Sequence, residues 1–200
     1  DFNVKLMDID NHCKKNNIKH YYIVPNYQDQ RDEELIVENF GDLNLLTGSS
    51  GLGYELGLKY GKSSNHKPFV INGDENNKSV VLVGSFSNQT TLQMNYYYNR
   101  DKKSIEIDPL EVIEGQLTIK TLMSKINDND KELMFFTSRS KVDHLSQEEV
   151  SLKLEDFISD LAVELKKINF NNIIVAGGET SGAVVKKLGY RSYIVGDSVS

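Results

Sequence analysis

The sequence predicts an α/β fold of three layers, a mainly parallel sheet with helices on both faces. The first observation is that strand candidates such as VVLVG (80–84), and NNIIVA (171–176) after its two asparagines, are continuously apolar and alternate with helical segments. Such strands have both faces buried, which is typical of parallel sheets covered by helices. The second is that turns rich in Gly, Ser and Thr follow apolar strands. Ligands of parallel sheets bind beyond those strand ends.

The first 61 residues predict a unit of their own. KHYYIVP (19–25) is a strand candidate closed by a proline, and RDEELIVENF (31–40) has the composition of a helix. LNLLTGSSGLGYELGLKYG (43–61) predicts a strand, a Gly-rich turn and a helix that ends at its last glycine. The polar, turn-rich stretch 62–79 then interrupts the alternation, so we expect it to be a linker.

Residues 80–200 predict one α/β domain in which strands and helices alternate. The strand candidates are 80–84, 103–109, 131–139, 171–176 and 191–195. A turn and a helix occupy 85–100. Another helix follows the fourth strand and runs to Leu188, with Gly189 directly after its end.

The clearest helix spans residues 146–168. Its apolar residues recur every three or four positions, which predicts one buried stripe. The stripe consists of Val150, Leu154, Phe157, Leu161, Leu165 and Ile168. Ser146 and Glu149 have the spacing of a capping box at the start of this helix.

Composition excludes several classes of protein. A hydrophobic fraction of 38% and a charged fraction of 26% are those of a globular protein. No apolar run approaches the roughly 20 residues of a membrane span, and the first residues lack the apolar core of a secretory signal. The single cysteine suits a cytoplasmic protein. A net charge of −6 argues against a nucleic-acid partner.

The turn GGETSG (177–182) is the strongest candidate site. Gly177 and Gly178 follow an apolar strand, and Thr180 and Ser181 occupy the first turn of the next helix. The free N–H groups of a helix N-terminus attract phosphate, and glycines let the backbone approach it. Glu179 has three interpretations: it contacts magnesium, a ribose, or the amides of its own helix.

Familiar phosphate-binding motifs do not match this turn. The P-loop pattern requires Lys and Ser or Thr where Ala183 and Val184 stand. The dinucleotide pattern fails because Gly178 directly follows Gly177. A tight strand-to-helix connection without a ligand therefore explains the residues about as well as a phosphate loop does.

A second turn, GSFSNQT (84–90), has the same shape. Ser85 and Ser87 follow an apolar strand. Ser87 is either a ligand of the same anion or only the N-cap of the next helix. Because both turns follow strands of one predicted parallel sheet, we expect them to face a shared cleft.

The remaining candidates favour structural roles. The four histidines have no metal-ligand spacing, so the sequence predicts no protein metal site. Tyr96–Tyr98 is interpreted as a half-buried helix face. Ser138 and Ser140, at another strand end, are interpreted first as turn residues.

Taken together, the motifs resemble a known family. VAGGETSGAVVKKLG (175–189) resembles the signature of the four-carbon acid sugar kinases. VVLVGSFSNQTTLQ (80–93) is similar to the strand, turn and helix that open the C-terminal nucleotide-binding domain of that family. LLTGSSGLGYELG (45–57) is similar to the segment that closes its N-terminal domain, and LMFFTSRS (133–140) fits a further strand.

The resemblance implies a function and a domain plan. Residues 1–61 would be the end of a domain that holds the sugar acid, 62–79 a linker, and 80–200 most of a nucleotide-binding domain. The implied activity is ATP-dependent phosphorylation of a threonate- or erythronate-type acid, with Mg²⁺ expected beside ATP and a homo-oligomer compatible with it. The implied nucleotide-binding residues are Ser85, Ser87, Gly177, Gly178, Glu179, Thr180 and Ser181.

Two family motifs have no counterpart in this sequence. One is an Asp-Asp motif followed by Thr-Gly, which would precede residue 45. The other is Lys-Ser-Gly-Asn-Phe-Gly, which would follow YIVGDSVS (193–200). We therefore expect the chain to be a piece of a longer protein, inactive by itself, and no catalytic base is assigned. A non-catalytic nucleotide-binding module and a structural domain without a ligand are the alternatives.

Overall fold

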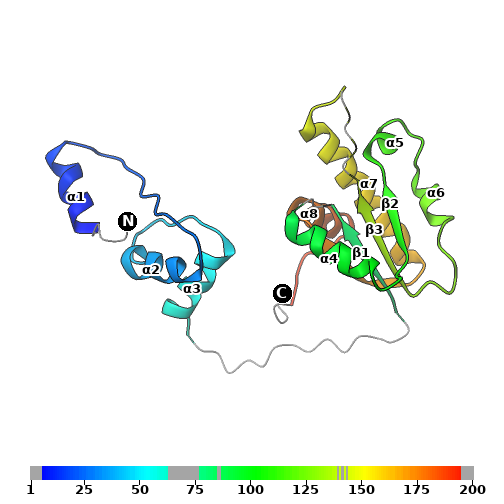
Figure 1. The fold of residues 1–200 in the computed structure, drawn as a ribbon, viewed down its shortest axis with the longest axis horizontal. Coiled ribbons are helices and arrows are strands. Elements are labelled where there is room, and N and C mark those ends of the chain that lie inside the picture. The colour runs from blue at the N-terminus through cyan, green and yellow to red at the C-terminus, as the bar shows by residue number, and fades with distance from the viewer. Residues whose placement is uncertain are drawn as a thin grey trace. The chain divides into compact units, whose positions relative to one another are not determined.

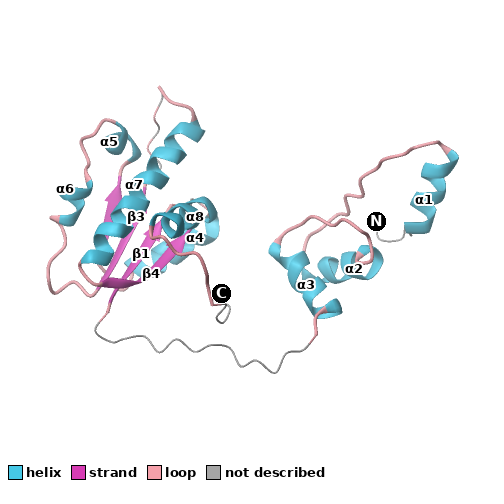
Figure 2. Cartoon of the chain, turned by 180° about the vertical axis from the view of Figure 1, so that it is seen from behind, coloured by secondary structure: helices cyan, strands magenta, loops and turns pink. Residues whose placement is uncertain are grey.

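The computed structural model describes residues 6–62, 77–84, 87–138, 140, 142 and 144–194. The chain divides into two compact units, Asp1–Lys67 and Pro68–Ser200. Figures 1 and 2 show helices in the described part of the first unit, and helices around a sheet in the second. Most of the predicted linker, residues 63–76, lies outside the described residues.

The described part of the first unit is helical. Its helices are α1 (Leu6–Lys15), α2 (Gln30–Phe40) and α3 (Ser50–Tyr60). The Asp29 side chain caps α2 by accepting hydrogen bonds from two N–H groups of its first turn. The Nζ of Lys59 on α3 donates to the carbonyl oxygen of Val37 on α2 at 2.9 Å, which ties the two helices together. The helices predicted at 31–40 and at the end of 43–61 are confirmed.

The strands predicted at 19–25 and at the start of 43–61 are wrong. Residues 19–25 and 43–49 have no regular structure. Tyr22 and Val24 are 94% and 86% exposed. An apolar run forms a stable strand only where a neighbouring strand takes up its backbone N–H and C=O groups. No strand neighbours these residues in the described part of this unit.

The described part of the second unit contains one parallel sheet. Its strands are β1 (Lys78–Val83), β2 (Ser104–Ile107), β3 (Glu132–Thr137) and β4 (Phe170–Ala176). They lie in the order β2-β3-β1-β4, and each neighbouring pair is parallel. Four of the five predicted strands are thus confirmed. Val83 lies opposite Phe136 and Ala176, so the carboxyl ends of β1, β3 and β4 are level at one edge.

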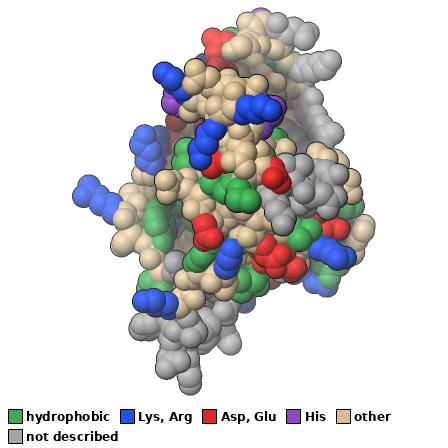
Figure 3. Space-filling view, turned by 90° about the vertical axis from the view of Figure 1, so that its left-hand side faces the viewer, with side chains coloured by type: hydrophobic (Ala, Val, Ile, Leu, Met, Phe, Trp, Pro, Cys, Tyr) green, Lys and Arg blue, Asp and Glu red, His purple; other side chains and the backbone are tan. Residues whose placement is uncertain are grey.

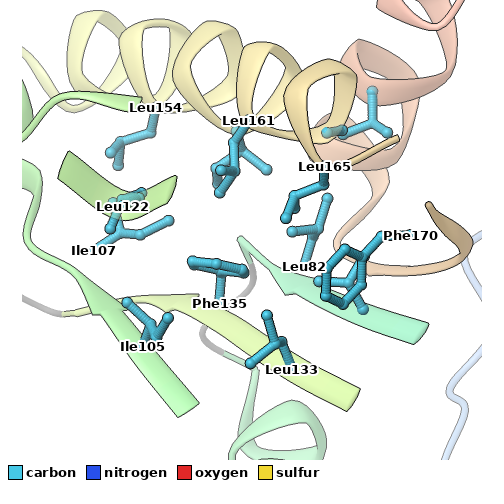
Figure 4. Close-up of a cluster of buried hydrophobic side chains, with 14 of the residues drawn as sticks. Leu82, Ile105, Ile107, Leu122, Leu133, Phe135, Leu154, Leu161, Leu165 and Phe170 are labelled. Atoms are coloured by element: carbon cyan, nitrogen blue, oxygen red, sulfur yellow. The ribbon is translucent and has the colours of Figure 1, made fainter. Parts of the chain in front are cut away.

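Helices cover both faces of this sheet, which confirms the predicted three-layer α/β fold. They are α4 (Asn88–Tyr98), α5 (Pro109–Ile113), α6 (Ile119–Met123), α7 (Gln147–Lys167) and α8 (Gly178–Lys187). Figure 4 shows α7 over one face and the green ribbon of α4 beneath the other. Leu122 of α6 and Val184 of α8 join the core under α7. On the opposite face, the ring of Tyr98 in α4 meets Phe136 of β3 edge-on, with centroids 5.6 Å apart.

Helix α7 begins with the predicted capping box. The Ser146 Oγ accepts from the backbone N–H of Glu149 at 3.3 Å, and the Glu149 Oε2 accepts from the backbone N–H of Ser146 at 2.9 Å. Its buried residues are Leu154, Ile158, Ser159, Leu161, Ala162 and Leu165. Ile168, predicted in the stripe, is 39% exposed. As the C-cap, with φ −107°, it leaves the helical path and the stripe.

Helix α8 ends as its glycine predicts. Gly189 has φ +77°, and its N–H donates to the carbonyl oxygen of Lys186 at 3.1 Å. The N–H of Tyr190 donates to the carbonyl oxygen of Val185 at 3.3 Å, which completes a Schellman motif. The strand predicted at 191–195 is wrong for residues 191–194, which are irregular and exposed. Residue 195 lies outside the described residues.

The surface carries charges of both signs. On the face seen in Figure 3, Lys and Arg side chains are interspersed with Asp and Glu. Within the described ranges, no helix combines the length and the apolar character that crossing a bilayer requires.

The core predicts a large effect for one leucine of α7. Leu161 is fully buried against the sheet (Figure 4). Leu161→Ala should lower the free energy of unfolding by about 2–5 kcal/mol, because it removes buried methyl groups and leaves a cavity. Urea denaturation followed by circular dichroism measures this. Leu152→Ala on the same helix, where the leucine is 56% exposed, is the matched control. Similar losses in both variants would contradict the packing described.

The capping box predicts a pH dependence of stability. The backbone N–H and the hydroxyl of Ser146 both donate to the Glu149 carboxylate, which lowers the pKa of Glu149. A carboxylate whose pKa is lowered by folding stabilises the protein above its unfolded pKa of about 4.3. That stabilisation is lost as the pH falls through the lower, folded pKa.

The Glu149→Gln variant should therefore lose less of its free energy of unfolding than the parent does as the pH falls from about 5 to about 3. Urea titrations at a series of pH values measure the free energy of unfolding. The control is Glu148→Gln, which removes the same charge one residue earlier in the helix. If Glu149→Gln and the parent lose stability equally over this range, the capping box does not contribute.

Candidate functional site

The topology of the sheet creates a crevice beside the end of β1. Helix α4, which follows β1, covers one face of the sheet, whereas α7 and α8, which follow the neighbouring strands β3 and β4, cover the other. Where adjacent strands send their helices to opposite faces, the helices part and leave a space outside the carboxyl ends. The candidate site lies at this edge.

Two residues from different turns meet in this crevice. Gly84 follows β1, and its N–H donates to the carbonyl oxygen of Ala176 at 3.0 Å. A Cβ on Gly84 would lie 2.1 Å from the Oγ1 of Thr180 and 3.1 Å from its Cβ. A side chain at position 84 would overlap Thr180 unless one of the two residues moved, so glycine allows the closest approach. The turns that begin at Gly84 and Gly177 therefore meet through Gly84 and Thr180.

The N-terminus of α8 is formed by the GGETSG turn. Gly177 is the N-cap residue with φ +123° and ψ +130°, a conformation that glycine adopts without strain. Gly178 has open space where a Cβ would project. The Ser181 Oγ donates to the carbonyl oxygen of Gly177 at 2.6 Å and closes the turn. Gly177 thus provides the backbone conformation and the carbonyl oxygen that hold the turn together. Gly178 has no side chain, so it leaves the first turn of α8 accessible.

Helix α8 differs from the other helices of its unit in how it begins. The described helices α4 to α7 each have an N-cap side chain that accepts a hydrogen bond from the first turn. These side chains belong to Ser87, Asp108, Thr118 and Ser146. Gly177 provides no such cap. The first N–H groups of α8 have no intrahelical acceptor either, because a helix begins with unpaired donors.

A cavity of about 250 Å³ lies against this N-terminus. The sheet edge contributes Gly84 and Thr137, and α8 contributes Glu179 and Thr180. The first three turns of α7 form the opposite wall with Gln147, Val150, Ser151, Leu154, Glu155 and Ile158. A second hollow of about 560 Å³ shares Gln147, Ser151, Glu155 and Glu179 with it.

The structure places the predicted nucleotide-binding residues in different ways. Glu179 and Thr180 line the cavity, and Gly177, Gly178 and Ser181 form the turn beside it. Ser87 caps α4 by accepting from the backbone N–H of Thr90 at 3.1 Å. Ser85 lies outside the described residues. Nucleotide binding by this set stays a prediction.

Sequence reasoning missed part of the cavity wall. Thr137 ends β3, and Gln147, Ser151 and Glu155 recur every four residues along α7. A signal was available, because the helix after a strand of a parallel sheet begins at the carboxyl edge. The predicted capping box at Ser146 marks the start of α7, and so could have located its first turns beside the site.

Polar residues at the ends of β2 and β3 have structural partners. Asp108 accepts from the backbone N–H of Leu110 at 2.8 Å and caps α5. The Ser140 Oγ donates to the Asp108 carboxylate at 2.7 Å and lies 3.2 Å from the Ser138 Oγ. These contacts agree with the interpretation of both serines as turn residues. In the described part of the chain, no group of three or more His, Cys, Asp or Glu is arranged to hold a metal ion.

The contact between Gly84 and Thr180 predicts energetic coupling. Gly84→Ala should lower the free energy of unfolding by about 1–3 kcal/mol, because its methyl group overlaps the threonine hydroxyl. Thr180→Ala removes that hydroxyl, so the double variant should lose less than the sum of the single losses, by about 0.5–3 kcal/mol. Urea denaturation gives the four values. Gly182→Ala, with open space at the Cβ position, is the control and should change little. Additive losses would refute the contact.

The chain is similar to solved and curated proteins across most of its length. The crystal structure of a Haemophilus influenzae protein of the DUF1537 family is 27% identical, with a TM-score of 0.55, over 99% of this chain and 50% of that one. A 3-oxo-tetronate kinase of Haemophilus influenzae is 30% identical, over 90% of this chain and 45% of the relative. One of Pseudomonas fluorescens is 27% identical, over 79% of this chain and 39% of the relative. The chain spans about half the length of these relatives.

A family model matches most of the second unit. The model for a nucleotide-binding C-terminal domain matches residues 80–200. The match includes Gly84, the GGETSG turn and the whole of α7, and so every residue that lines the cavity. Through this nucleotide-binding C-terminal domain and its kinase relatives, the chain belongs to the four-carbon acid sugar kinase family, as its motifs predict.

Proposed function

We propose that this chain binds ATP with the phosphates at the N-terminus of α8, for phosphoryl transfer to a four-carbon sugar acid. One observation carries the proposal. Helix α8, whose N-cap residue has no side chain, borders the cavity at the end of β1 together with α7. A helix start that lacks an internal cap, faces a cavity and has glycine at its N-cap and first helical positions is suited to an anion.

The residues of the turn divide the work of holding a phosphate. The N–H groups of Gly178 to Thr180 are the free donors of the first turn. Gly178, which has no side chain, lets a phosphate oxygen reach them. Thr180 adds a hydroxyl at the cavity wall. Ser181 acts by closing the turn, because its N–H and its hydroxyl both donate to the carbonyl oxygen of Gly177.

Magnesium accompanies ATP in phosphoryl transfer and neutralises charge on its phosphates. Mg²⁺ is commonly held by phosphate oxygens, water and only one or two carboxylates. The donor set here fits that pattern, because Glu179 is an exposed carboxylate in the first turn of α8. We propose Glu179 as the residue nearest to such an ion. The other residues of the turn bind and orient the nucleotide.

The acceptor is proposed from the relatives. The similar proteins are named 3-oxo-tetronate kinases, and a tetronate is a four-carbon sugar acid. In the transfer, an acceptor hydroxyl oxygen bonds to the γ-phosphorus as the bond to the β,γ-bridging oxygen breaks, and the hydroxyl proton leaves. The contribution of this chain is to fix the γ-phosphate in line with that oxygen. The single cysteine of the chain suits a cytoplasmic enzyme.

Calorimetry with ATP tests the nucleotide site. Thr180→Ala should weaken ATP binding by about 10- to 100-fold, because a hydrogen bond to a charged group is lost. Gly178→Val should weaken it more, because a branched side chain covers the N–H groups of the first turn. The control is Thr121→Ala, which removes the same hydroxyl from the exposed start of α6 and should leave ATP affinity unchanged.

Circular dichroism shows whether each variant is folded. If folded Thr180→Ala and Gly178→Val bind ATP as tightly as the parent, the turn is only a connection and the proposal fails. ADP release with four-carbon sugar acids, measured on a protein that spans the full length of the relatives, separates a kinase from a non-catalytic nucleotide-binding module.

A further inference from the structure

Helix α7 presents two different rows of side chains to the cavity. Gln147, Ser151 and Glu155 are four residues apart and form a polar row. Val150, Leu154 and Ile158 have the same spacing and form an apolar row beside it. Residues four apart lie above one another on a helix, so each row is continuous.

The opposite wall of the cavity contains two threonines with little exposed surface. Thr137 and Thr180 are each only 5% exposed, and both line the cavity. The Thr137 Oγ1 reaches the carbonyl oxygen of Val83 only at 3.5 Å, the limit for a hydrogen bond. In the described part of the chain, no side-chain hydrogen bond is found for Thr180. Among the described residues, only the Tyr97 hydroxyl is fully enclosed without a hydrogen-bond partner. The Thr180 hydroxyl is therefore accessible from the cavity that it lines, where a polar ligand group can bond to it.

The charges on α7 decide which part of a ligand that side of the cavity accepts. On α7, Glu155 lines the cavity and Glu148 lines the adjoining hollow. Carboxylates repel phosphates and sugar-acid carboxylates, but they accept hydrogen bonds from neutral hydroxyl groups. The Ser151 Oγ donates to the Glu155 Oε1 at 3.0 Å and orients that carboxylate. The α7 side of the cavity therefore suits an uncharged, hydroxyl-bearing group with an apolar surface.

We propose that the cavity between α7 and α8 binds the nucleoside of the bound nucleotide, with Glu155 accepting hydrogen bonds from the ribose hydroxyls. The apolar row, with Val150 and Leu154, lies along the base. Carboxylates recognise ribose hydroxyls in this way in other nucleotide-binding folds. This inference rests on the proposed function, because the phosphates must occupy the start of α8 for the nucleoside to reach α7.

Three ligands separate the ribose contact from the phosphate contact. Calorimetry measures the affinities of ATP, 2′,3′-dideoxy-ATP and inorganic tripolyphosphate. The parent chain should bind ATP at least about ten-fold more tightly than the dideoxy analogue, because the analogue lacks both hydroxyls. In Glu155→Ala this preference should fall to within about three-fold, while tripolyphosphate binds as tightly as before or more tightly. Glu164→Ala, the same change further along α7, should keep the preference of the parent.

The outcomes distinguish this inference from the proposed function. If the parent binds ATP but does not prefer it to the dideoxy analogue, or if folded Glu155→Ala keeps the full preference, Glu155 does not read the ribose while the ATP site stands. If Glu155→Ala weakens tripolyphosphate as much as ATP, the residue acts on the phosphates and the inference is wrong. If the parent binds no ATP, both proposals fail. Circular dichroism confirms the folding of each variant.

Discussion

The arrangement of the second unit follows from β1 lying between β3 and β4 in a parallel sheet. The three carboxyl ends are level, because Val83 lies opposite Phe136 and Ala176. Crossover connections between parallel strands are right-handed. The chain moves from β1 across the sheet to β2 in one direction and from β3 past β1 to β4 in the other. The helices of these two crossings must therefore lie on opposite faces, and they part at the end of β1.

Close packing at this point depends on a glycine rather than on a large apolar side chain. Gly84 has no Cβ, so the first turn of α8 approaches β1 until Thr180 lies over its backbone. The contact holds the start of α8 at the crevice. Other helices in the unit satisfy their first N–H groups with their own side chains, such as Ser87 and Ser146. Gly177 has no side chain with which to do this. The start of α8 is therefore held in place by packing, while its first N–H groups have no acceptor within the helix.

Helix α7 serves the core and the cavity with different parts of its length. Its later turns contribute Leu161 and Leu165, which are fully buried against the sheet (Figure 4). Its first turns extend to the carboxyl edge, where Ser151 and Glu155 line the cavity. The long buried stripe gives these polar residues a rigid support, which is what a binding residue needs to keep its geometry. The capping box at Ser146 keeps the exposed first turn from fraying.

The sequence by itself determined the fold class, the four strands of the sheet, the helix 146–168 with its cap, and the glycine that ends α8. Each depends on local information: apolar runs, helical periodicity, and side chains that bond their own backbone. It also pointed to GGETSG, because two glycines before a helix are a local signal.

Only the tertiary structure decided which apolar segments become strands and which residues meet. KHYYIVP has a strand composition, but the described part of its unit offers it no neighbouring strand for its backbone hydrogen bonds. The contact of Gly84 with Thr180 joins residues almost a hundred positions apart, and the wall of Thr137, Ser151 and Glu155 joins a strand end to the next helix. Such contacts depend on strand order and on the face that each helix covers. Both are set by packing of the whole domain, and no local pattern records them.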